Sequence, residues 1–263
     1  MTAAEVHVEE AGSTGPLLLC LHGIGSSSAS FAHQLQAFAD EFRVVAWDAP
    51  GYGRSPDPDG ALGLDDYADA AAEVIRARGG SAHVLGVSWG GVIALRLALR
   101  HPDLVASLIV ADSSPGSGTD PGKAAAMRAR VPELRALGAR AFAERRGPRL
   151  VSADAPPALV RRVVDIMADA VRLPGYAHAA EAMATTDLRA DLPRITAPTL
   201  VLCGDKDQVT GPDAAQALAG GLHRSAGVVV KDAGHLAHQE QPERFNAWVL
   251  AHLHIVTNPR TEG

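Results

Sequence analysis

A serine between two glycines is the residue of this sequence best placed to act as a nucleophile. The segment Gly-Val-Ser-Trp-Gly (residues 86–90) ends the apolar run His83–Val87 and opens the amphipathic stretch Gly90–Arg100. At a tight turn from a strand into a helix, a serine projects its hydroxyl above the sheet, and glycines leave room for the strained backbone. The start of the helix also points free N–H groups at the same place. The pattern therefore predicts that Ser88 is a nucleophile rather than a structural turn residue.

A serine hydroxyl needs a general base, and the base needs an acid that orients it. After this kind of turn, the expected chain order is serine, acid and then histidine. Of the eleven histidines, only His235 stands on a loop after a late strand-like run, Gly227–Lys231. We expect His235 to be the base.

Three aspartates compete for the role of the acid. The strand run Thr199–Cys203 is followed by Gly-Asp-Lys-Asp, which offers Asp205 and Asp207. A chain that leaves a strand needs a few residues to turn back over the sheet, so Asp207 is favoured and Asp205 is expected to support the turn. Asp112 follows an earlier strand run and is interpreted as a turn residue, although it stays an alternative for the acid.

A glycine-rich loop near the N-terminus could bind the oxyanion of an acyl-transfer reaction. The segment His-Gly-Ile-Gly-Ser-Ser (residues 22–27) follows the apolar run Leu17–Leu21 directly. In folds with this serine turn, one oxyanion donor comes from such a loop and the other from the residue after the nucleophile. The backbone N–H groups of Ile24 and Trp89 are therefore predicted to form the oxyanion hole.

These residues must be positioned by alternating strands and helices. The predicted strands are Glu5–Glu9, Leu17–Leu21, Arg43–Trp47, His83–Val87, Ser107–Ala111, Thr199–Cys203 and Gly227–Lys231. The predicted helices between them are Ser28–Phe42, Leu64–Arg78, Gly90–Arg100, Asp213–Leu222 and Pro242–His252. Short apolar runs that alternate with helices predict an α/β fold with a mostly parallel sheet covered on both faces. The first run alternates with acids and is expected to be an antiparallel edge strand.

One region breaks the alternation. Residues 116–193 contain helical patterns and no clear strand run, and they are too many for an ordinary loop. The helical patterns are Gly122–Arg130, Glu133–Glu144, Pro157–Ala170 and Tyr176–Thr185. We therefore predict a catalytic core of residues 1–115 and 194–263, with residues 116–193 inserted as a helical cap over the ligand-binding edge of the sheet.

Composition excludes several other classes of protein. The chain has 263 residues with 47% hydrophobic and 21% charged residues, which is typical of a globular protein. Its net charge of −6 argues against nucleic-acid binding. No apolar run approaches the ~18 residues of a membrane span, and the N-terminus resembles no secretory signal. Cys20 and Cys203 lie in apolar runs and are expected to be buried, reduced thiols, which fits a cytoplasmic protein.

Five segments together resemble the successive motifs of the α/β-hydrolase superfamily. They read LCLHGIGSS, VVAWDAPGYGRSP, LGVSWGG, TAPTLVLCGDKDQVT and DAGHLAHQEQPERF. The chain is most similar to the 3-oxoadipate enol-lactonase-like hydrolases in its residues 174–177, 187–189 and 234–246. The resemblance implies an α/β-hydrolase fold with an inserted cap, and Asp207 matches the family's G-x-x-D position for the acid. The tryptophan of the enol-lactonase cap is missing here.

The sequence therefore predicts a cofactor-free serine hydrolase, with no metal site, that cleaves a small carboxylic ester or lactone. Two alternatives stay open: hydrolysis of a C–C bond in a ring-cleavage dienoate, and a non-catalytic ligand receptor on the same fold. The oligomeric state, including a homo-oligomer, is open too. Arginines at 145, 146 and 149 are interpreted as a solvated helix face. An anionic substrate, however, would require a cap arginine to face the pocket. The candidates are Arg128, Arg145, Arg146 and Arg172.

Overall fold

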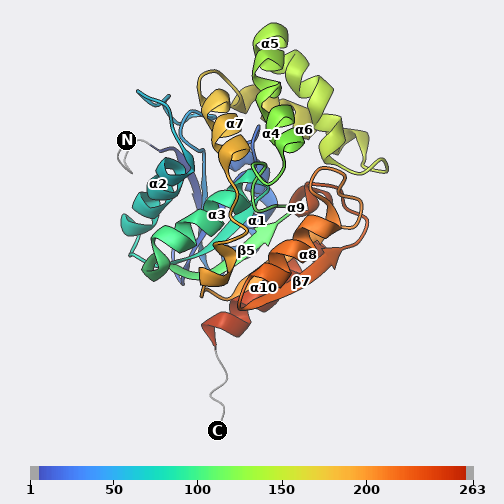
Figure 1. Cartoon of the computed structure of the whole chain (residues 1–263). Coiled ribbons are helices and arrows are strands. Elements are labelled where there is room, and N and C mark those ends of the chain that lie inside the picture. The colour runs from blue at the N-terminus through green and yellow to red at the C-terminus, as the bar shows by residue number, and fades with distance from the viewer. Residues whose placement is uncertain (1–5, 259–263) are drawn as a thin grey trace.

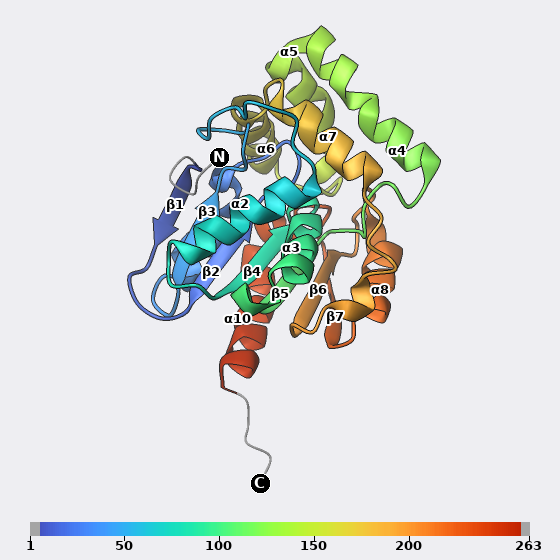
Figure 2. The same ribbon diagram turned by 60° about the vertical axis from the view of Figure 1, so that its left-hand side comes forward.

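The computed structural model of the chain describes residues 6–258 and is built around one mixed sheet. Its strands are β1 (Val8–Ala11), β2 (Leu17–Leu21), β3 (Arg43–Trp47), β4 (Ala82–Val87), β5 (Val105–Ala111), β6 (Thr199–Gly204) and β7 (Ser225–Val230). They lie in the order β1-β3-β2-β4-β5-β6-β7 (Figure 2). β1 pairs antiparallel with β3, and every other pair is parallel. The predicted mostly parallel sheet with an antiparallel edge strand is confirmed.

Helices cover both faces of this sheet (Figure 2). One face packs against α2 (Leu64–Arg76), α3 (Trp89–Arg100) and α8 (Gly211–Gly221), and the other against α1 (Ala32–Phe38) and α10 (Pro242–Thr257). The shorter helices are η1 (Ser28–Phe31), η2 (Pro102–Leu104), η3 (Gly147–Leu150), η4 (Leu192–Arg194) and α9 (Ala237–Glu240). Because strands such as β2 and β4 are buried on both sides, their sequences are continuous apolar runs rather than alternating ones.

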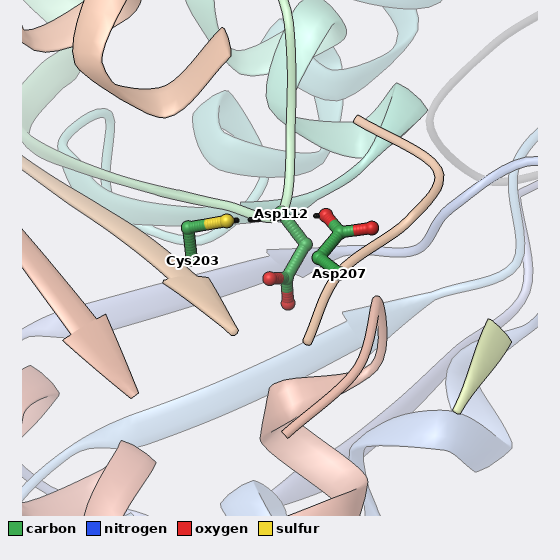
Figure 3. Close-up of side chains that lie close together, drawn as sticks. All are labelled: Asp112, Cys203 and Asp207. Atoms are coloured by element: carbon green, nitrogen blue, oxygen red, sulfur yellow. Dashed lines mark hydrogen bonds between the residues drawn. The ribbon is translucent and has the colours of Figure 1, made fainter. Parts of the chain in front are cut away.

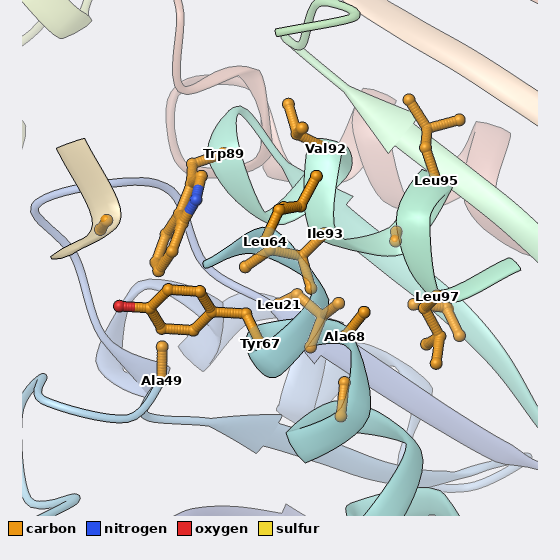
Figure 4. Packing of buried hydrophobic residues seen from close by; sticks show 14 of the residues in the cluster. Leu21, Ala49, Leu64, Tyr67, Ala68, Trp89, Val92, Ile93, Leu95 and Leu97 are labelled. Carbon is orange, nitrogen blue, oxygen red and sulfur yellow. The ribbon is translucent and has the colours of Figure 1, made fainter. Parts of the chain in front are cut away.

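The start of α3 is held by aromatic packing in the core (Figure 4). The ring of Trp89 meets that of Tyr67 on α2 edge to face, with 4.7 Å between the ring centroids. Both side chains are fully buried. Aromatic pairs of this kind stabilise a fold by about 0.5–1.5 kcal/mol beyond the area they bury. This packing fixes the first turn of α3, which directly follows the serine turn.

The bounds of several elements differ from those expected. Strand β1 begins at Val8 rather than Glu5, which lies outside the described residues. Its register is set by antiparallel pairing, with Val8 opposite Trp47, and the N–H of His7 bonds the Ser55 hydroxyl instead. The predicted helix Ser28–Phe42 divides into η1 and the shorter α1, and α10 continues to Thr257.

Between β5 and β6 the chain forms helices alone; no strand occurs in residues 112–198, all of which the structure describes. The helices are α4 (Pro121–Arg128), α5 (Arg130–Arg146), α6 (Pro157–Ala170) and α7 (Gly175–Thr185). They gather beyond one end of the sheet (Figure 1). We call residues 116–193 the cap segment. Its α5 bends at Gly138, which has φ 75° and ψ 165°, a conformation that glycine adopts most readily.

The two cysteines, Cys20 on β2 and Cys203 on β6, are buried and free, as predicted. Burial raises the pKa of both thiols, so neither is a thiolate near neutral pH. Among the helices of residues 6–258, none has the length and apolar character needed to cross a membrane.

Candidate active site

Ser88 occupies a strained turn between β4 and α3. Its backbone has φ 54° and ψ −117°, a conformation that is rare for a residue with a side chain. The turn is fixed by hydrogen bonds on both sides: the N–H of Ser88 donates to Ala111 O at 2.8 Å, and the Ser113 hydroxyl donates to Ser88 O at 2.7 Å. Such strain persists only where the surrounding structure enforces it, and it is commonest at functional sites.

The glycines around Ser88 are required by space. A Cβ added at Gly86 would lie 2.3 Å from Gly90 O on α3, and one at Gly90 would lie 2.0 Å from Leu21 O on β2. These are the collisions with helix and strand that the sequence pattern implies. A Cβ at Gly23 would lie 3.2 Å from the Cβ of Ser88, so the loop after β2 runs directly beside the serine.

A continuous line of hydrogen bonds joins Ser88, His235 and Asp207. His235 Nε2 lies 2.9 Å from Ser88 Oγ, and His235 Nδ1 lies 3.0 Å from Asp207 Oδ2. Because an ionised carboxylate only accepts, Nδ1–H donates to Asp207 and Nε2 is left to accept the proton of Ser88. His235 is 3% and Asp207 5% exposed, so water does not compete for these contacts.

Asp207 is held in its ionised state. Its Oδ1 accepts from the N–H of Val209 at 2.7 Å, and its Oδ2 accepts from the hydroxyl of Thr210 at 2.6 Å. Burial opposes ionisation, but the hydrogen bonds from His235 and Thr210 outweigh it and hold the pKa of Asp207 well below its usual range.

The other two candidate acids bond backbone N–H groups instead. Asp205 is exposed and accepts from Ala233 N–H at 3.2 Å, a contact with the loop after β7 rather than within its own turn. Asp112 has φ 47°, in keeping with a turn. It is also fully buried and accepts from Gly204 N–H and Ala237 N–H, two contacts that the interpretation as a turn residue did not foresee.

The loop after β2 is shaped by a histidine that the sequence analysis did not single out. His22 is fully buried; its Nε2 accepts from the N–H of Ala49 at 2.9 Å, so its Nδ1–H donates to Gly23 O at 2.8 Å. Burial lowers the pKa of His22 and keeps the ring neutral. Its position directly before the glycine-rich loop is the only sequence signal for this role. The structure places Ile24 and Trp89, the two predicted oxyanion donors, beside Ser88 on the wall of one cavity.

That cavity has a volume of about 330 Å³ and lies between the sheet and the cap segment. Ser88 and His235 line it from the sheet side, and Arg130, Arg146 and Tyr176 line it from the cap segment. Its walls thus combine apolar surface with a few convergent polar groups, as small-molecule sites usually do.

Of the four candidate cap arginines, Arg146 lies at the pocket and the other three lie elsewhere. Arg128 is bound to Glu181, Arg145 to Glu133 and Arg172 to Asp57, and none of them lines the cavity. Arg146 is half-buried and does line it, which corrects its interpretation as part of a solvated helix face; Arg149 also borders the cavity but is exposed.

Arg130, which the sequence analysis missed, also lines the cavity. Arg128 ends α4 and pairs with Glu181, whereas Arg130 begins α5 and reaches the cavity. Within residues 6–258, the buried Nε of Arg130 has no hydrogen-bond partner. Tyr176 is close by: burial raises the pKa of its phenol, while the charges of Arg130 and Arg146 act against that rise.

A serine turn after one parallel strand, with the acid and the histidine on loops after two later strands, defines an α/β-hydrolase fold. The chain belongs to this family. The sequence pattern of the alpha/beta hydrolase fold family matches residues 16–242.

Several hydrolases resemble the chain over nearly its whole length. The 3-oxoadipate enol-lactonase 2 of Acinetobacter baylyi is 29% identical over 241 residues, which cover 90% of this chain and 88% of that protein. The 2-(acetamidomethylene)succinate hydrolase of Mesorhizobium japonicum is 31% identical over 258 residues, covering 90% and 87%. A malate-bound thermophilic esterase from Thermogutta terrifontis superposes with a TM-score of 0.89 at 30% identity, covering 96% and 94%. The predicted resemblance to enol-lactonases is confirmed.

Proposed function

We propose that the protein is a cofactor-free serine hydrolase that cleaves a small carboxylic ester or lactone through an acyl-enzyme. One observation carries this proposal: Ser88, His235 and Asp207 form an unbroken line of hydrogen bonds that opens onto a cavity. The names of the relatives, a lactonase, a hydrolase and an esterase, support the same class of reaction.

The geometry gives each group a role in that reaction. Ser88 Oγ attacks the substrate carbonyl while His235 Nε2 takes its proton, and Asp207 holds the imidazole and stabilises its protonated form. The backbone N–H groups of Ile24 and Trp89 bind the tetrahedral oxyanion. His235 then returns the proton to the leaving alcohol, and later removes a proton from the water that releases the acid.

The cap segment acts as a lid in this proposal, with residues 1–115 and 194–263 as the catalytic core. Its inner side chains close the cavity over Ser88. Excluding water from such a site strengthens the electrostatic contacts within it. Contacts with the core hold it in place: the Arg172 guanidinium donates to Gly53 O, and a Cβ on Gly175 would lie 2.1 Å from Gly51 O.

The substrate of this proposal carries a carboxylate of its own. Arg130 and Arg146 bring two positive charges to the cap side of the cavity. Arg146 pairs with Glu133 at 2.9 Å, whereas Arg130 has no ion-pair partner among residues 6–258. A guanidinium with a free donor suits a carboxylate. The names of the relatives point the same way, since adipate, succinate and malate are dicarboxylates.

The test of the proposal is the variant Ser88→Ala, assayed with aryl esters of rising acyl length beside an enol-lactone and a ring-cleavage dienoate. Wild type should prefer an ester or the lactone, and Ser88→Ala should lose nearly all turnover while its melting temperature changes little. Ser117→Ala is the matched control, because Ser117 lines the same cavity without contacting His235. Retention of most of the kcat by Ser88→Ala would rule out the serine mechanism. A wild type that binds these compounds tightly without turnover would instead be a receptor.

A further inference from the structure

Asp112 is a buried carboxylate that is not part of the hydrogen-bonded line of Ser88, His235 and Asp207. It connects the loop that carries Asp207 with the loop that carries His235. Asp112 stands at the end of β5 and has no exposed surface. Its Oδ1 accepts from Gly204 N–H at 2.9 Å, and its Oδ2 accepts from Ala237 N–H at 3.2 Å. Gly204 is three residues before Asp207, and Ala237 is two residues after His235. A single side chain therefore holds the start of the Asp207 loop close to the end of the His235 loop.

Hydrogen bonds hold the backbone of Asp112 as well as its side chain. Its φ of 47° lies in the left-handed region, which aspartate adopts more readily than most residues with a side chain. The backbone of Asp112 is tied as well, since its N–H donates to Leu202 O on β6 at 2.8 Å. Figure 3 shows Asp112 beside Cys203 and Asp207.

This group of side chains is a hydrogen-bonded network rather than a metal site. Ligand atoms of Asp112, Cys203 and Asp207 lie within 4.8 Å of one another. The oxygens of both carboxylates already accept hydrogen bonds from backbone groups, Thr210 and His235. Burial raises the pKa of the Cys203 thiol, whose Sγ lies 3.9 Å from Asp207 Oδ2.

The charge of Asp112 is coupled to the proposed catalytic groups. The titratable groups that face it are Cys203 on β6, Asp207 after β6 and His235 after β7. Burial raises the pKa of Asp112 to about 7; a positive charge on His235 opposes the rise, and the negative charge of Asp207 adds to it. The ionised form of Asp112 is therefore favoured most when His235 is protonated, which is its state in the tetrahedral intermediate.

We propose that Asp112 is a second positioning carboxylate of the hydrolase: it sets the Asp207 loop against the His235 loop and stabilises the protonated imidazole. This inference rests on the serine mechanism proposed above. Asp112 is not among the residues that line the cavity, so it acts through the two loops and through its charge.

The test compares Asp112→Asn with wild type on one ester. The amide keeps the shape, removes the charge and turns one of the two acceptors into a donor. Losing one charge-assisted hydrogen bond should lower kcat about 10- to 100-fold, while KM stays within about twofold. The acid limb of the pH profile of kcat/KM should move to lower pH, because less negative charge faces the protonated imidazole.

Asp205→Asn is the matched control, since Asp205 also joins the two loops, through Ala233 N–H, but from the exposed side. Its kcat and pH profile should stay close to wild type. Asp112→Ser serves as a second variant, whose small hydroxyl removes the charge and leaves one acceptor; each protein is assayed below its unfolding midpoint. An Asp112 variant that melts earlier but keeps the wild-type kcat and pH profile would overturn the inference. Full activity of Ser88→Ala would instead overturn the proposed mechanism, whatever Asp112 does.

Discussion

At the residue scale, the hydrogen-bond partners of the Asp207 carboxylate determine its proposed role. We expect Asp207→Asn to fold and to lose kcat by a factor on the order of 10³–10⁴, because an amide facing Nδ1 favours the wrong imidazole tautomer. Steady-state kinetics and circular dichroism check this, with Asp205→Asn as the control. A small loss in Asp207→Asn beside a large loss in Asp112→Asn would place the acid on the loop after β5.

The chain order of Ser88, Asp207 and His235 made them predictable from sequence, because each follows an apolar run that ends in a turn. The roles of His22 and Arg130, and the contacts of Asp112 with both loops, could not be found in this way. Their tasks depend on contacts with segments far away in the chain, such as Ala49 for His22 and Ala237 for Asp112. A local sequence pattern does not indicate contacts between segments that are far apart in the chain.

Among the elements, the junction of β4 and α3 leaves no space for an added side chain. Gly90→Ala would place a Cβ 2.0 Å from Leu21 O, so helix and strand must separate. We expect a loss of about 1–3 kcal/mol in the free energy of unfolding, together with most of the activity. Gly220→Ala on α8, where a Cβ meets nothing within 4 Å, should instead stabilise the protein by about 0.5–1 kcal/mol. Chemical denaturation of both variants measures the difference, and equal effects would contradict this account.

Elements buried on both faces were easiest to predict. The runs Leu17–Leu21 and Arg43–Trp47 match β2 and β3 residue for residue, because a buried parallel strand admits almost only apolar side chains. The edge strand β1 was misplaced, since pairing with β3 rather than its own pattern sets its register. The kink at Gly138 also escaped prediction, because a single glycine within a helical pattern is compatible with a straight helix.

The whole molecule carries a net charge of −6, yet the cap side of its cavity holds Arg130 and Arg146. We expect Arg130→Gln to lower kcat/KM about tenfold for an aryl hemiester of a dicarboxylic acid, and less than about threefold for a neutral ester of equal length. Arg128→Gln is the matched control, because Arg128 pairs with Glu181 away from the cavity. Equal losses on both esters would mean that Arg130 shapes the pocket without recognising charge.

The central claim is that Ser88 forms a covalent bond to the substrate acyl group, and a phosphonate ester tests it most directly. A p-nitrophenyl alkylphosphonate resembles the tetrahedral intermediate and leaves a stable adduct on a reactive serine. Mass spectrometry of the digested protein should find one phosphonyl group on the peptide that carries Ser88, formed in step with release of one equivalent of p-nitrophenol and with loss of esterase activity. A protein that stays active and unmodified, or that carries the phosphonyl group on another residue, would contradict the account.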